Sequence, residues 1–404
     1  MELPSLRKLN IMNILAQMLF WAAFAALTGY QTALLLNRGF SSGEAGIFAS
    51  LRCLAGIIAQ PLLGGWADRH PNVPLRRILN VCLAAALVVN VLFALTRPNF
   101  WGTALIFLAL GVLELNAYPL IDAMAVQFIS AGMNVNYSLG RGFGSLSYAI
   151  TGAALGYQSA RFGVESVLVT HGILVLLLMA VIGCYPQVGR KSGREKSQED
   201  QPHSVWYILR TSKSFSFMLV AVFLSMTAVK PAASFLVNII ESKGGSEVHL
   251  GTALFLMASM ELATGLFFPT LKKHIRSSVL MAAAVFFMAL KPVLFFIAPT
   301  LGWLLAAQPI QMFGNGLFNP ASVYYANENV SPADRVRGQT IMMMVSSGMG
   351  GMVGNLIAGY AIDWGGVDSM LVLMGCIGFV GFLLSIAAVM LDSNRRSPAR
   401  IQKT

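Results

Sequence analysis

A single cation lies near the start of an otherwise uncharged stretch of the sequence, residues 136–156. This cation is Arg141, and an aromatic residue, Tyr148, follows it seven residues later, two helical turns away on the same face. Five glycines between positions 140 and 156 would let such a helix pack closely against its neighbours. Inside a membrane an arginine costs about 2.5 to 3.5 kcal/mol unless an acid or a polar cavity receives it. We therefore expect the chain to supply a partner for Arg141.

Two acids in an earlier apolar stretch, residues 100–129, could provide that partner. Glu114 and Asp122 lie eight residues apart, about 80° from one another around an ideal helix, so both could face one broad cavity. The short connection 130–136 makes the two stretches antiparallel neighbours. It also places Asp122, which lies 19 residues before Arg141, at a comparable depth. We therefore predict that Asp122 is the partner of Arg141.

The composition indicates that these stretches lie in a membrane. Hydrophobic residues make up 56% of the 404 residues and charged residues only 11%, against about 25% charged in soluble proteins. Apolar runs of about 20 residues or more, enough to span a hydrocarbon core about 30 Å thick, recur along the chain. We identify twelve such runs, at about residues 9–36, 43–66, 77–96, 100–129, 137–159, 164–186, 214–240, 249–270, 277–297, 300–325, 338–361 and 367–391. The predicted fold class is an all-α polytopic membrane protein with twelve transmembrane helices.

The net charge of +11 is interpreted as a topology signal rather than a nucleic-acid-binding surface. If both termini are placed on one side, most of the 28 Lys and Arg residues fall on that side, which is the positive-inside pattern. Both termini are therefore expected in the cytoplasm, and the protein is expected in the plasma membrane as a multi-pass monomer. The expected partners are the lipid bilayer and a small solute, with no nucleic acid.

The loop after the second apolar run carries a recognisable pattern. Gly64, Asp68 and Arg69 are followed by the basic pair Arg76 and Arg77. At this place among twelve runs, the pattern resembles the signature loop of the major facilitator superfamily, whose fold has two six-helix bundles. The glycine would let helices approach each other, and the aspartate could bind a basic group or a helix N-terminus.

Two further segments resemble one group within that superfamily, the oligosaccharide/proton symporters. Residues 140–148 resemble the fifth-helix motif of the lactose permease, and residues 119–123 resemble its fourth-helix acid segment. In that family the acid and the arginine bind sugar hydroxyls, and an aromatic residue two turns after the arginine stacks on the sugar ring. The resemblance implies these roles for Asp122, Arg141 and Tyr148, with tyrosine where the lactose permease has tryptophan. We call these three the clamp residues, because a bidentate guanidinium and an aromatic face suit a sugar ring.

The second half of the chain carries its own intramembrane charges, Lys230, Glu261 and Lys291. By position, the resemblance implies that Glu261 links solute and proton binding, with Lys291 in the place of a ninth-helix arginine. The tenth run departs from the symporter pattern, since Gln311 and a glycine stand where the lactose permease has a coupling histidine and glutamate. Gln311 and Asn315 remain suited to binding solute hydroxyls.

Without that histidine and glutamate, Glu261 or Glu114 would have to titrate if transport is coupled to protons. Solute loading would require protonated Glu261, and loss of its proton would free Lys291 to pair with it. Arg52, deep in the second run, is expected to form a structural salt bridge. The predicted charge network consists of Arg52, Glu114, Lys230, Glu261 and Lys291.

An internal repeat supports the division into two halves. Residues 154–157 with Gly163 recur as residues 357–360 with Gly366, at an offset of 203 residues. The fifth and eleventh runs are therefore interpreted as equivalent, as in two parallel repeats with a site near the membrane midplane between them.

A long polar stretch, residues 187–213, separates the halves and is expected to be a flexible cytoplasmic linker. The predicted domains are then a six-helix bundle over residues 1–186 and a second bundle, with a short basic tail, over residues 214–404.

Together these features predict a secondary active transporter that imports a sugar or glycoside by proton symport with alternating access. One alternative is a proton-coupled exporter of drugs or amphiphiles, which the methionines at 342–344 keep open, and another is a carrier of nucleosides or aromatic acids. No enzyme pattern is found, because the glycines at 140–144 follow no strand and the histidines lack metal-ligand spacing. We therefore expect no catalytic residues, no metal and no cofactor.

Overall fold

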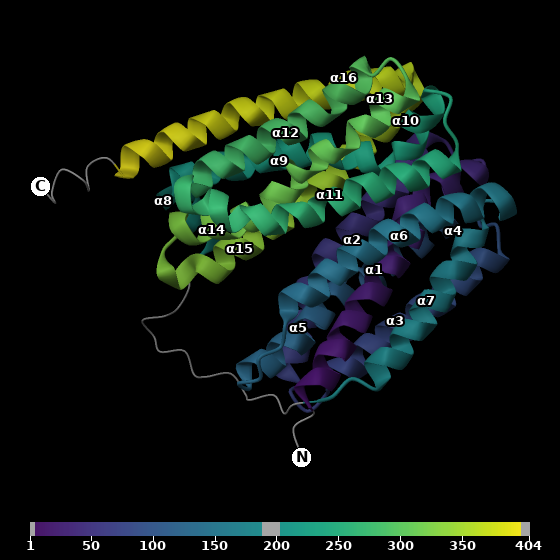
Figure 1. Ribbon diagram of the computed structural model, residues 1–404, viewed down its shortest axis with the longest axis horizontal. Coiled ribbons are helices and arrows are strands. Elements are labelled where there is room, and N and C mark those ends of the chain that lie inside the picture. Colours follow the sequence, from purple (N-terminus) through teal and green to yellow (C-terminus); the bar gives the residue numbers. More distant parts are fainter. Residues whose placement is uncertain (1–4, 188–202, 397–404) are drawn as a thin grey trace, which may run out of the picture. The chain divides into compact units, whose positions relative to one another are not determined.

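The computed structural model describes residues 5–187 and 203–396, and within these ranges the regular secondary structure is helical, without strands (Figure 1). The chain divides into two compact units. Unit 1 contains residues 5–187 and Ile240–Ser259, and unit 2 contains residues 203–239 and 260–396. One helix, α11 (Glu247–His274), is shared between them.

Unit 1 begins with seven helices, four of which start at a capping side chain, the first being Ser5 before α1. Ser41 and Glu44 form a reciprocal capping box at the start of α2. Asn99 caps α4 and Asn136 caps α6 through their side-chain oxygens. Helix α1 packs against α6 and α7, and α2 packs against α4. The helices are α1 (Leu6–Asn37), α2 (Ser42–Arg69), α3 (Leu75–Leu95), α4 (Phe100–Glu114), α5 (Ala117–Ser130), α6 (Tyr137–Phe162) and α7 (Ser166–Gly183).

The rest of the chain forms shorter and more interrupted elements. A π-helical segment, η4, separates α15 from α16, and such segments often mark functional positions in a helix. Helices α9, α12 and α16 run alongside one another (Figure 1). The remaining elements are α8 (Val205–Thr211), α9 (Lys213–Ser234), α10 (Leu236–Ser242), α12 (Ser277–Ile297), α13 (Leu301–Ala306), η2 (Gln308–Met312), α14 (Asn315–Asn329), η3 (Pro332–Asp334), α15 (Arg335–Met343), η4 (Met344–Met349) and α16 (Gly350–Arg396).

Eight helical stretches within the described ranges are long and apolar enough to cross a membrane. Two of them combine several elements, since Phe100–Ser130 contains α4 and α5, and Pro332–Asn394 extends through α15 into α16. The protein is therefore a multi-pass membrane protein. The count of twelve spans, the cytoplasmic placement of the termini and the bundle limits at 1–186 and 214–404 stay predictions.

The predicted linker, residues 187–213, is described only in part. Residues 188–202 lie outside the described ranges, whereas α8 occupies the later part of the linker. Just before α8, His203 donates its backbone N–H to Asp334, and its ring Nδ1 lies 3.0 Å from the same carboxylate. The end of the linker is thus attached to η3 of unit 2.

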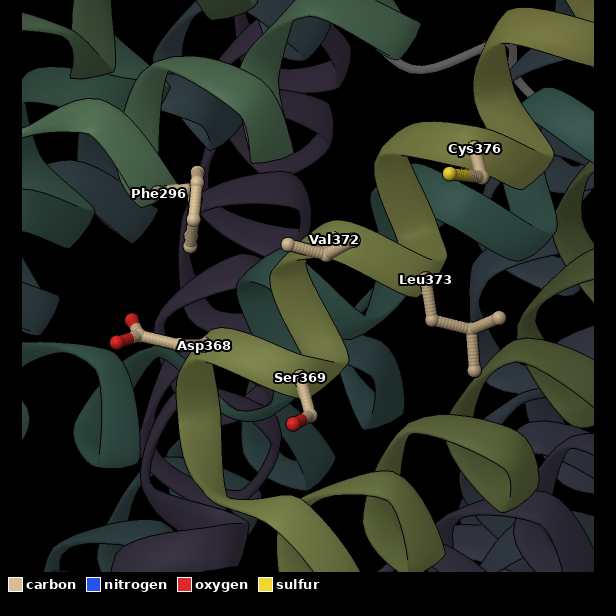
Figure 2. A pocket seen from close by; sticks show the side chains of 6 residues that line it. All are labelled: Phe296, Asp368, Ser369, Val372, Leu373 and Cys376. Carbon is tan, nitrogen blue, oxygen red and sulfur yellow. The ribbon is translucent and has the colours of Figure 1, made fainter.

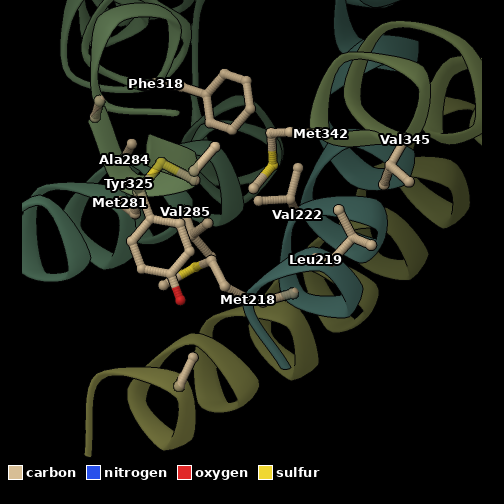
Figure 3. Packing of buried hydrophobic residues seen from close by; sticks show 14 of the residues in the cluster. Met218, Leu219, Val222, Met281, Ala284, Val285, Phe318, Tyr325, Met342 and Val345 are labelled. Carbon is tan, nitrogen blue, oxygen red and sulfur yellow. The ribbon is translucent and has the colours of Figure 1, made fainter. Parts of the chain in front are cut away.

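Methionine contributes strongly to the core of unit 2 (Figure 3). Met218 and Met281, from α9 and α12, have no exposed surface, and Met342 of α15 is only 2% exposed. They pack with Val222 and Phe318, so these methionines fill space between helices. Of the three consecutive methionines in the sequence, the first is therefore a core residue, while Met343 and Met344 are exposed.

Two pairs of glycines adopt left-handed backbone angles at equivalent places in the two halves. Gly163 after α6 has φ of 78°, and Gly366 within α16 has φ of 76°. The latter marks the break between the eleventh and twelfth predicted runs. Gly39 and Gly244, which end the first helical run of each half, have φ of 88° and 76°. Glycine adopts this region without a steric cost, so the two halves end corresponding helices in the same way.

Helices α2 and α4 approach each other closely at Gly111, which allows a direct test of this packing. A Cβ atom at Gly111 would lie 2.4 Å from the backbone oxygen of Arg52, so Gly111→Ala should push the helices apart. We expect a loss of about 1 to 3 kcal/mol of stability, measured by thermal unfolding in detergent. Gly65→Ala in α2 is the matched control, since no atom lies within 4 Å of its added Cβ. Equal melting temperatures for the two variants would contradict this packing.

Candidate functional site

Arg141 of α6 lies against two aromatic rings, which also contact each other, and forms no ion pair with a described acid. Its guanidinium carbon is 5.1 Å from the centre of the Trp21 ring and 4.7 Å from that of Tyr118. Both distances permit cation–π attraction, which is stronger away from water. The Nη1 atom of Arg141 is buried and has no hydrogen-bond partner within the described ranges. The arginine therefore keeps one buried donor available.

Asp122 of α5 is held by two hydrogen bonds from other helices. Gln17 of α1 donates its side-chain amide to Oδ1 over 2.8 Å, and Tyr137 of α6 donates its hydroxyl to Oδ2 over 2.8 Å. The indole N–H of Trp21 in turn donates to the Gln17 oxygen over 3.1 Å. The expected ion pair between Asp122 and Arg141 is not formed among the described residues. Neutral donors occupy the carboxylate instead. Asp122 contacts Gln17 and Arg141 contacts Trp21, and these two α1 residues are hydrogen-bonded to each other.

Tyr148, the third clamp residue, belongs to the same aromatic group. Its ring is half-buried and lies 6.4 Å from Trp21 and 6.5 Å from Phe24, measured between ring centres. Trp21 thus contacts both Arg141 and Tyr148, as their spacing on one helix face would allow. The structure brings the clamp residues around one side of α1.

Small residues allow α6 to come this close to α1. A Cβ atom at Gly140 would lie 2.5 Å from the amide nitrogen of Asn13, and one at Gly144 would lie 2.4 Å from Trp21. A larger residue at either position would displace the side chains that surround Arg141. The close packing that the sequence predicted along α6 therefore lets side chains of α1 reach the clamp residues.

Sequence reasoning did not assign Tyr118 and Tyr137, although a signal was present. Each lies four residues before a clamp residue, Tyr118 before Asp122 and Tyr137 before Arg141. Side chains at this spacing are neighbours on a helix surface. The hydrogen bond from Tyr137 to Asp122, however, joins two helices, and the spacing of residues within one helix cannot predict such a contact.

A second group of polar residues in unit 1 is buried. Glu114 receives a hydrogen bond from Nη2 of Arg52 over 2.9 Å, and Nε2 of His171 lies 3.1 Å from its other oxygen. The three residues are 6%, 4% and 2% exposed, respectively. Arg52 Nη1 also donates to Thr28 and Gln31 of α1. We call Arg52, Glu114 and His171 the buried triad; it contains the salt bridge expected for Arg52.

The position of Glu114 differs from the sequence prediction. The predicted run 100–129 is broken after Glu114, so Glu114 ends α4 while Asp122 lies in α5. The separation of about 80° between Glu114 and Asp122, which assumed one continuous ideal helix, therefore does not apply. The two acids occupy separate environments. The free backbone oxygen of Leu115 at the break accepts a hydrogen bond from Gln60 of α2 over 2.9 Å. Breaks in membrane helices are tolerated where protein groups bind the freed backbone in this way.

In unit 2, Gln311 connects an acid and a base. Its side-chain oxygen accepts a hydrogen bond from the Lys291 ammonium over 2.7 Å, and its nitrogen donates to Glu261 over 2.7 Å. Lys291 is 2% exposed, whereas Glu261 is half-buried. An uncharged amide therefore stands between Glu261 and Lys291, and it binds both. We call these three residues the amide bridge.

The two other predicted residues of unit 2 lie outside this bridge. Asn315, at the start of α14, has a buried side-chain oxygen without a hydrogen-bond partner in the described ranges. Lys230 of α9 is half-buried, and its ammonium forms no ion pair or hydrogen bond with any described residue. Both therefore retain polar atoms that could bind a solute.

The signature-loop residues lie at the end of α2 and the start of α3. Arg76 donates hydrogen bonds to the backbone oxygens of Gly183 and Tyr185, which fixes the end of α7. Asp68, Arg69 and Arg77 are exposed. No described atom lies within 4 Å of a Cβ placed on Gly64, so the expected close helix approach at this glycine is not present.

A surface groove of about 440 Å³ in unit 2 is lined by other residues (Figure 2). Its walls come from the end of α12 and from α16, and they carry only two polar side chains, Asp368 and Ser369. None of the clamp, triad or bridge residues lines it. The groove is therefore not the candidate site.

Comparisons with known proteins agree with this architecture. The uncharacterized transporter YwbF of Bacillus subtilis (strain 168) is 20% identical over 391 residues, which cover 93% of this chain and 95% of that protein. The crystal structure of the nucleoside transporter NupG has a TM-score of 0.78 at 16% identity, covering 96% of this chain and 99% of that one. A peptide transporter of the POT family, in an auto-inhibited form, has a TM-score of 0.73 at 12% identity, with 96% and 97% covered. The model of the MFS_1 like family matches residues 12–372, so the chain belongs to this family of membrane transporters and is not an enzyme.

Proposed function

We propose that this transporter imports a solute in which a sugar ring is joined to an aromatic or apolar group, such as an aryl glycoside or a nucleoside. The observation that carries the proposal is the arrangement of Arg141, whose buried Nη1 donor is without a partner among the described residues while two aromatic rings lie against the guanidinium. A buried donor left without a partner costs about 1 to 3 kcal/mol. A hydroxyl group of the solute would remove that cost.

The surroundings of Arg141 favour a solute with ring faces. Trp21, Phe24, Tyr118 and Tyr148 contact one another in a continuous aromatic group. Such rings pack well on the C–H face of a sugar and on a planar base or aryl group. Asp122 keeps acceptor capacity beyond its two hydrogen bonds, because an ionised carboxylate has about four acceptor positions. Donor, acceptor and ring faces therefore match the parts of a glycoside.

The glycoside and the nucleoside share the sugar ring, and they differ in the group attached to it. The likeness to the nucleoside transporter NupG concerns the fold alone. It is a reason to include nucleosides among the solutes tested, and it does not favour them over glycosides. Cationic drugs fit less well, since the central charged group of the clamp is itself a cation. Export of such amphiphiles is accordingly the less favoured function.

We further propose that import is coupled to protons by alternating access and that Glu261 is one of the coupling groups. Ionised Glu261 accepts the amide hydrogen bond of Gln311, which also holds Lys291. Protonation would remove the negative charge at one end of the amide bridge while the Lys291 ammonium remains at the other. The amide can then change partners, so the charge of Glu261 would alter the contacts of three helices, α11, α12 and η2.

The first prediction of this proposal concerns Arg141→Lys. Lysine keeps the charge but loses the planar fork that can contact two hydroxyls and stack on rings. We expect solute affinity to fall about tenfold or more, as loss of a hydrogen bond to a charged group would cause. The measurement is thermal shift in detergent with uridine, adenosine, phenyl glucosides, free hexoses and tetraphenylphosphonium, since a ligand that binds the folded state stabilises it more as its concentration rises above Kd.

Arg161→Lys is the matched control, because Arg161 lies on the same helix at its exposed end. The control should bind like the wild type. Stabilisation by tetraphenylphosphonium alone, unchanged in Arg141→Lys, would contradict the proposed solute and favour the exporter.

The second prediction concerns Glu261→Gln, which mimics the protonated acid. In liposomes with the membrane potential clamped at zero, a pH gradient of one unit can raise accumulation about tenfold for each coupled proton. We expect the accumulation ratio of the variant to be about tenfold lower than that of the wild type, while the variant still exchanges labelled for unlabelled solute. Glu241→Gln, at an exposed glutamate, is the control. An accumulation ratio equal to that of the wild type would rule out a coupling role for Glu261.

A further inference from the structure

His171 of α7 is a buried histidine with one nitrogen unoccupied. It is 2% exposed, and its Nδ1 atom has no hydrogen-bond partner within the described ranges. Its Nε2 atom lies 3.1 Å from Glu114. Buried side-chain nitrogens in folded proteins nearly always have a partner, so an unoccupied one requires an explanation.

We propose that His171 is a proton-binding site of the transport cycle, with Nδ1 as the atom that takes up the proton. Histidine is the side chain that ordinarily changes charge between about pH 5 and 8. With Nε2 3.1 Å from the Glu114 carboxylate, a neutral ring that carries its proton on Nε2 leaves the Nδ1 lone pair free to accept a proton. The resulting imidazolium remains in contact with the same carboxylate. This inference deepens the proposed function, because its transport consequence depends on proton-coupled import.

The buried triad contains a carboxylate, that of Glu114, which can contact a protonated His171 in addition to Arg52. Glu114 presents one oxygen to Arg52 and the other to His171. Arg52 has further acceptors in Thr28 and Gln31, so it does not depend on Glu114 alone. Glu114 is also the last residue of α4, where the helix dipole favours positive charge. Glu114 therefore offers its second oxygen to His171 at the end of α4.

The other charged groups near α7 are already paired with one another. Arg38 of α1 forms a hydrogen-bonded ion pair with Glu165, which precedes α7, over 2.7 Å. Arg97, between α3 and α4, lies 3.8 Å from the same glutamate. The nearby contact of α6 with α7 is the neutral pair Gln158 and Thr170. Within the described ranges, Glu114 and Arg52 are thus the charged groups in the immediate surroundings of His171.

Two routes connect the buried triad with the clamp. The first is the chain itself, since the helix break after Glu114 leads directly into α5, which carries Tyr118 and Asp122. The second is Phe24 of α1, whose ring centre lies 5.7 Å from the Arg52 guanidinium carbon and 5.5 Å from the Trp21 ring. A change in the charge of the triad can therefore shift the residues that contact Arg141.

The first experiment observes the proton directly and requires no solute. The full-length protein is labelled with ¹⁵N-histidine in lipid nanodiscs, and the ring nitrogen signals are recorded from pH 5 to 8. The His171 signal is the one that disappears in His171→Gln. We expect this signal to change from the neutral to the protonated ring within that range. A signal that stays neutral throughout would overturn the proposal.

The second experiment measures coupling with uridine and phenyl glucoside as labelled probes. Under a pH gradient of one unit and zero membrane potential, His171→Gln should reduce steady-state accumulation about tenfold, the factor contributed by one proton. Exchange of labelled for unlabelled probe should stay within twofold of the wild type. His274→Gln, at an exposed histidine, is the matched control and should behave as the wild type.

The outcomes separate this inference from the proposed function. Unchanged accumulation in His171→Gln would overturn the coupling role. Loss of exchange together with loss of accumulation would also overturn it, because that result indicates a structural defect. If the wild type transports neither probe, the proposed function fails, and the ¹⁵N titration alone then supports or overturns proton binding at His171.

Discussion

The ion pair between Arg52 and Glu114 is the contact on which the arrangement of unit 1 depends. An unpaired charge in hydrocarbon costs several kcal/mol, and removal of one partner from a buried pair typically costs about 3 to 5 kcal/mol. The pair fixes α2 to α4 at the same place where Gly111 allows their backbones to approach. The helix break that follows Glu114 is held by the same helix, α2, through Gln60. The direction of α5, and with it the position of Asp122, follows from this contact.

The protein accommodates its other intramembrane charges in different ways, and the differences suggest different tasks. Arg141 is received by aromatic faces, which attract a cation without satisfying its hydrogen-bond donors. Lys291 and Glu261 are joined through a neutral amide, which can rearrange more cheaply than a direct ion pair. Arg52 donates to Glu114, Thr28 and Gln31, while its Nε atom has no hydrogen-bond partner within the described ranges. The buried Nη1 donor of Arg141, also without a partner there, is the group suited to binding a solute hydroxyl.

The sequence allowed the fold class, the transporter family and the shared helix face of Arg141 and Tyr148 to be anticipated, because each depends on a regular pattern. Apolar runs reveal membrane helices, and a spacing of seven residues places Arg141 and Tyr148 on one face. The repeat of 203 residues is matched by the backbone angles of Gly163 and Gly366. The break after Glu114 was missed, although Pro119 carries a local signal for it. A proline has no N–H to bond the carbonyl four residues earlier, here that of Leu115, and Gln60 of α2 binds this oxygen instead.

The side-chain contacts that define the site could not be predicted from the sequence either. Asp122 and Arg141 lie at compatible positions, yet the carboxylate binds Gln17 and Tyr137, because neutral donors from α1 and α6 reach it. His171 looked like an isolated histidine in an apolar run, and only the tertiary fold, which brings it within 3.1 Å of Glu114, gives it a partner. Long-range pairing of this kind has no periodic signal in one chain.

The buried triad also bears on how this protein enters the membrane. Its members lie on α2, α4 and α7 in the order of synthesis, so Arg52 reaches the bilayer before Glu114, and His171 follows both. A helix that ends in a carboxylate inserts more readily when a cation is already waiting in a neighbouring helix, since each lone charge opposes insertion. The α2 and α4 segments should therefore leave the insertion machinery as a pair, and α7 would close the group last. In this view the ion pair guides assembly during translation before it has any part in transport.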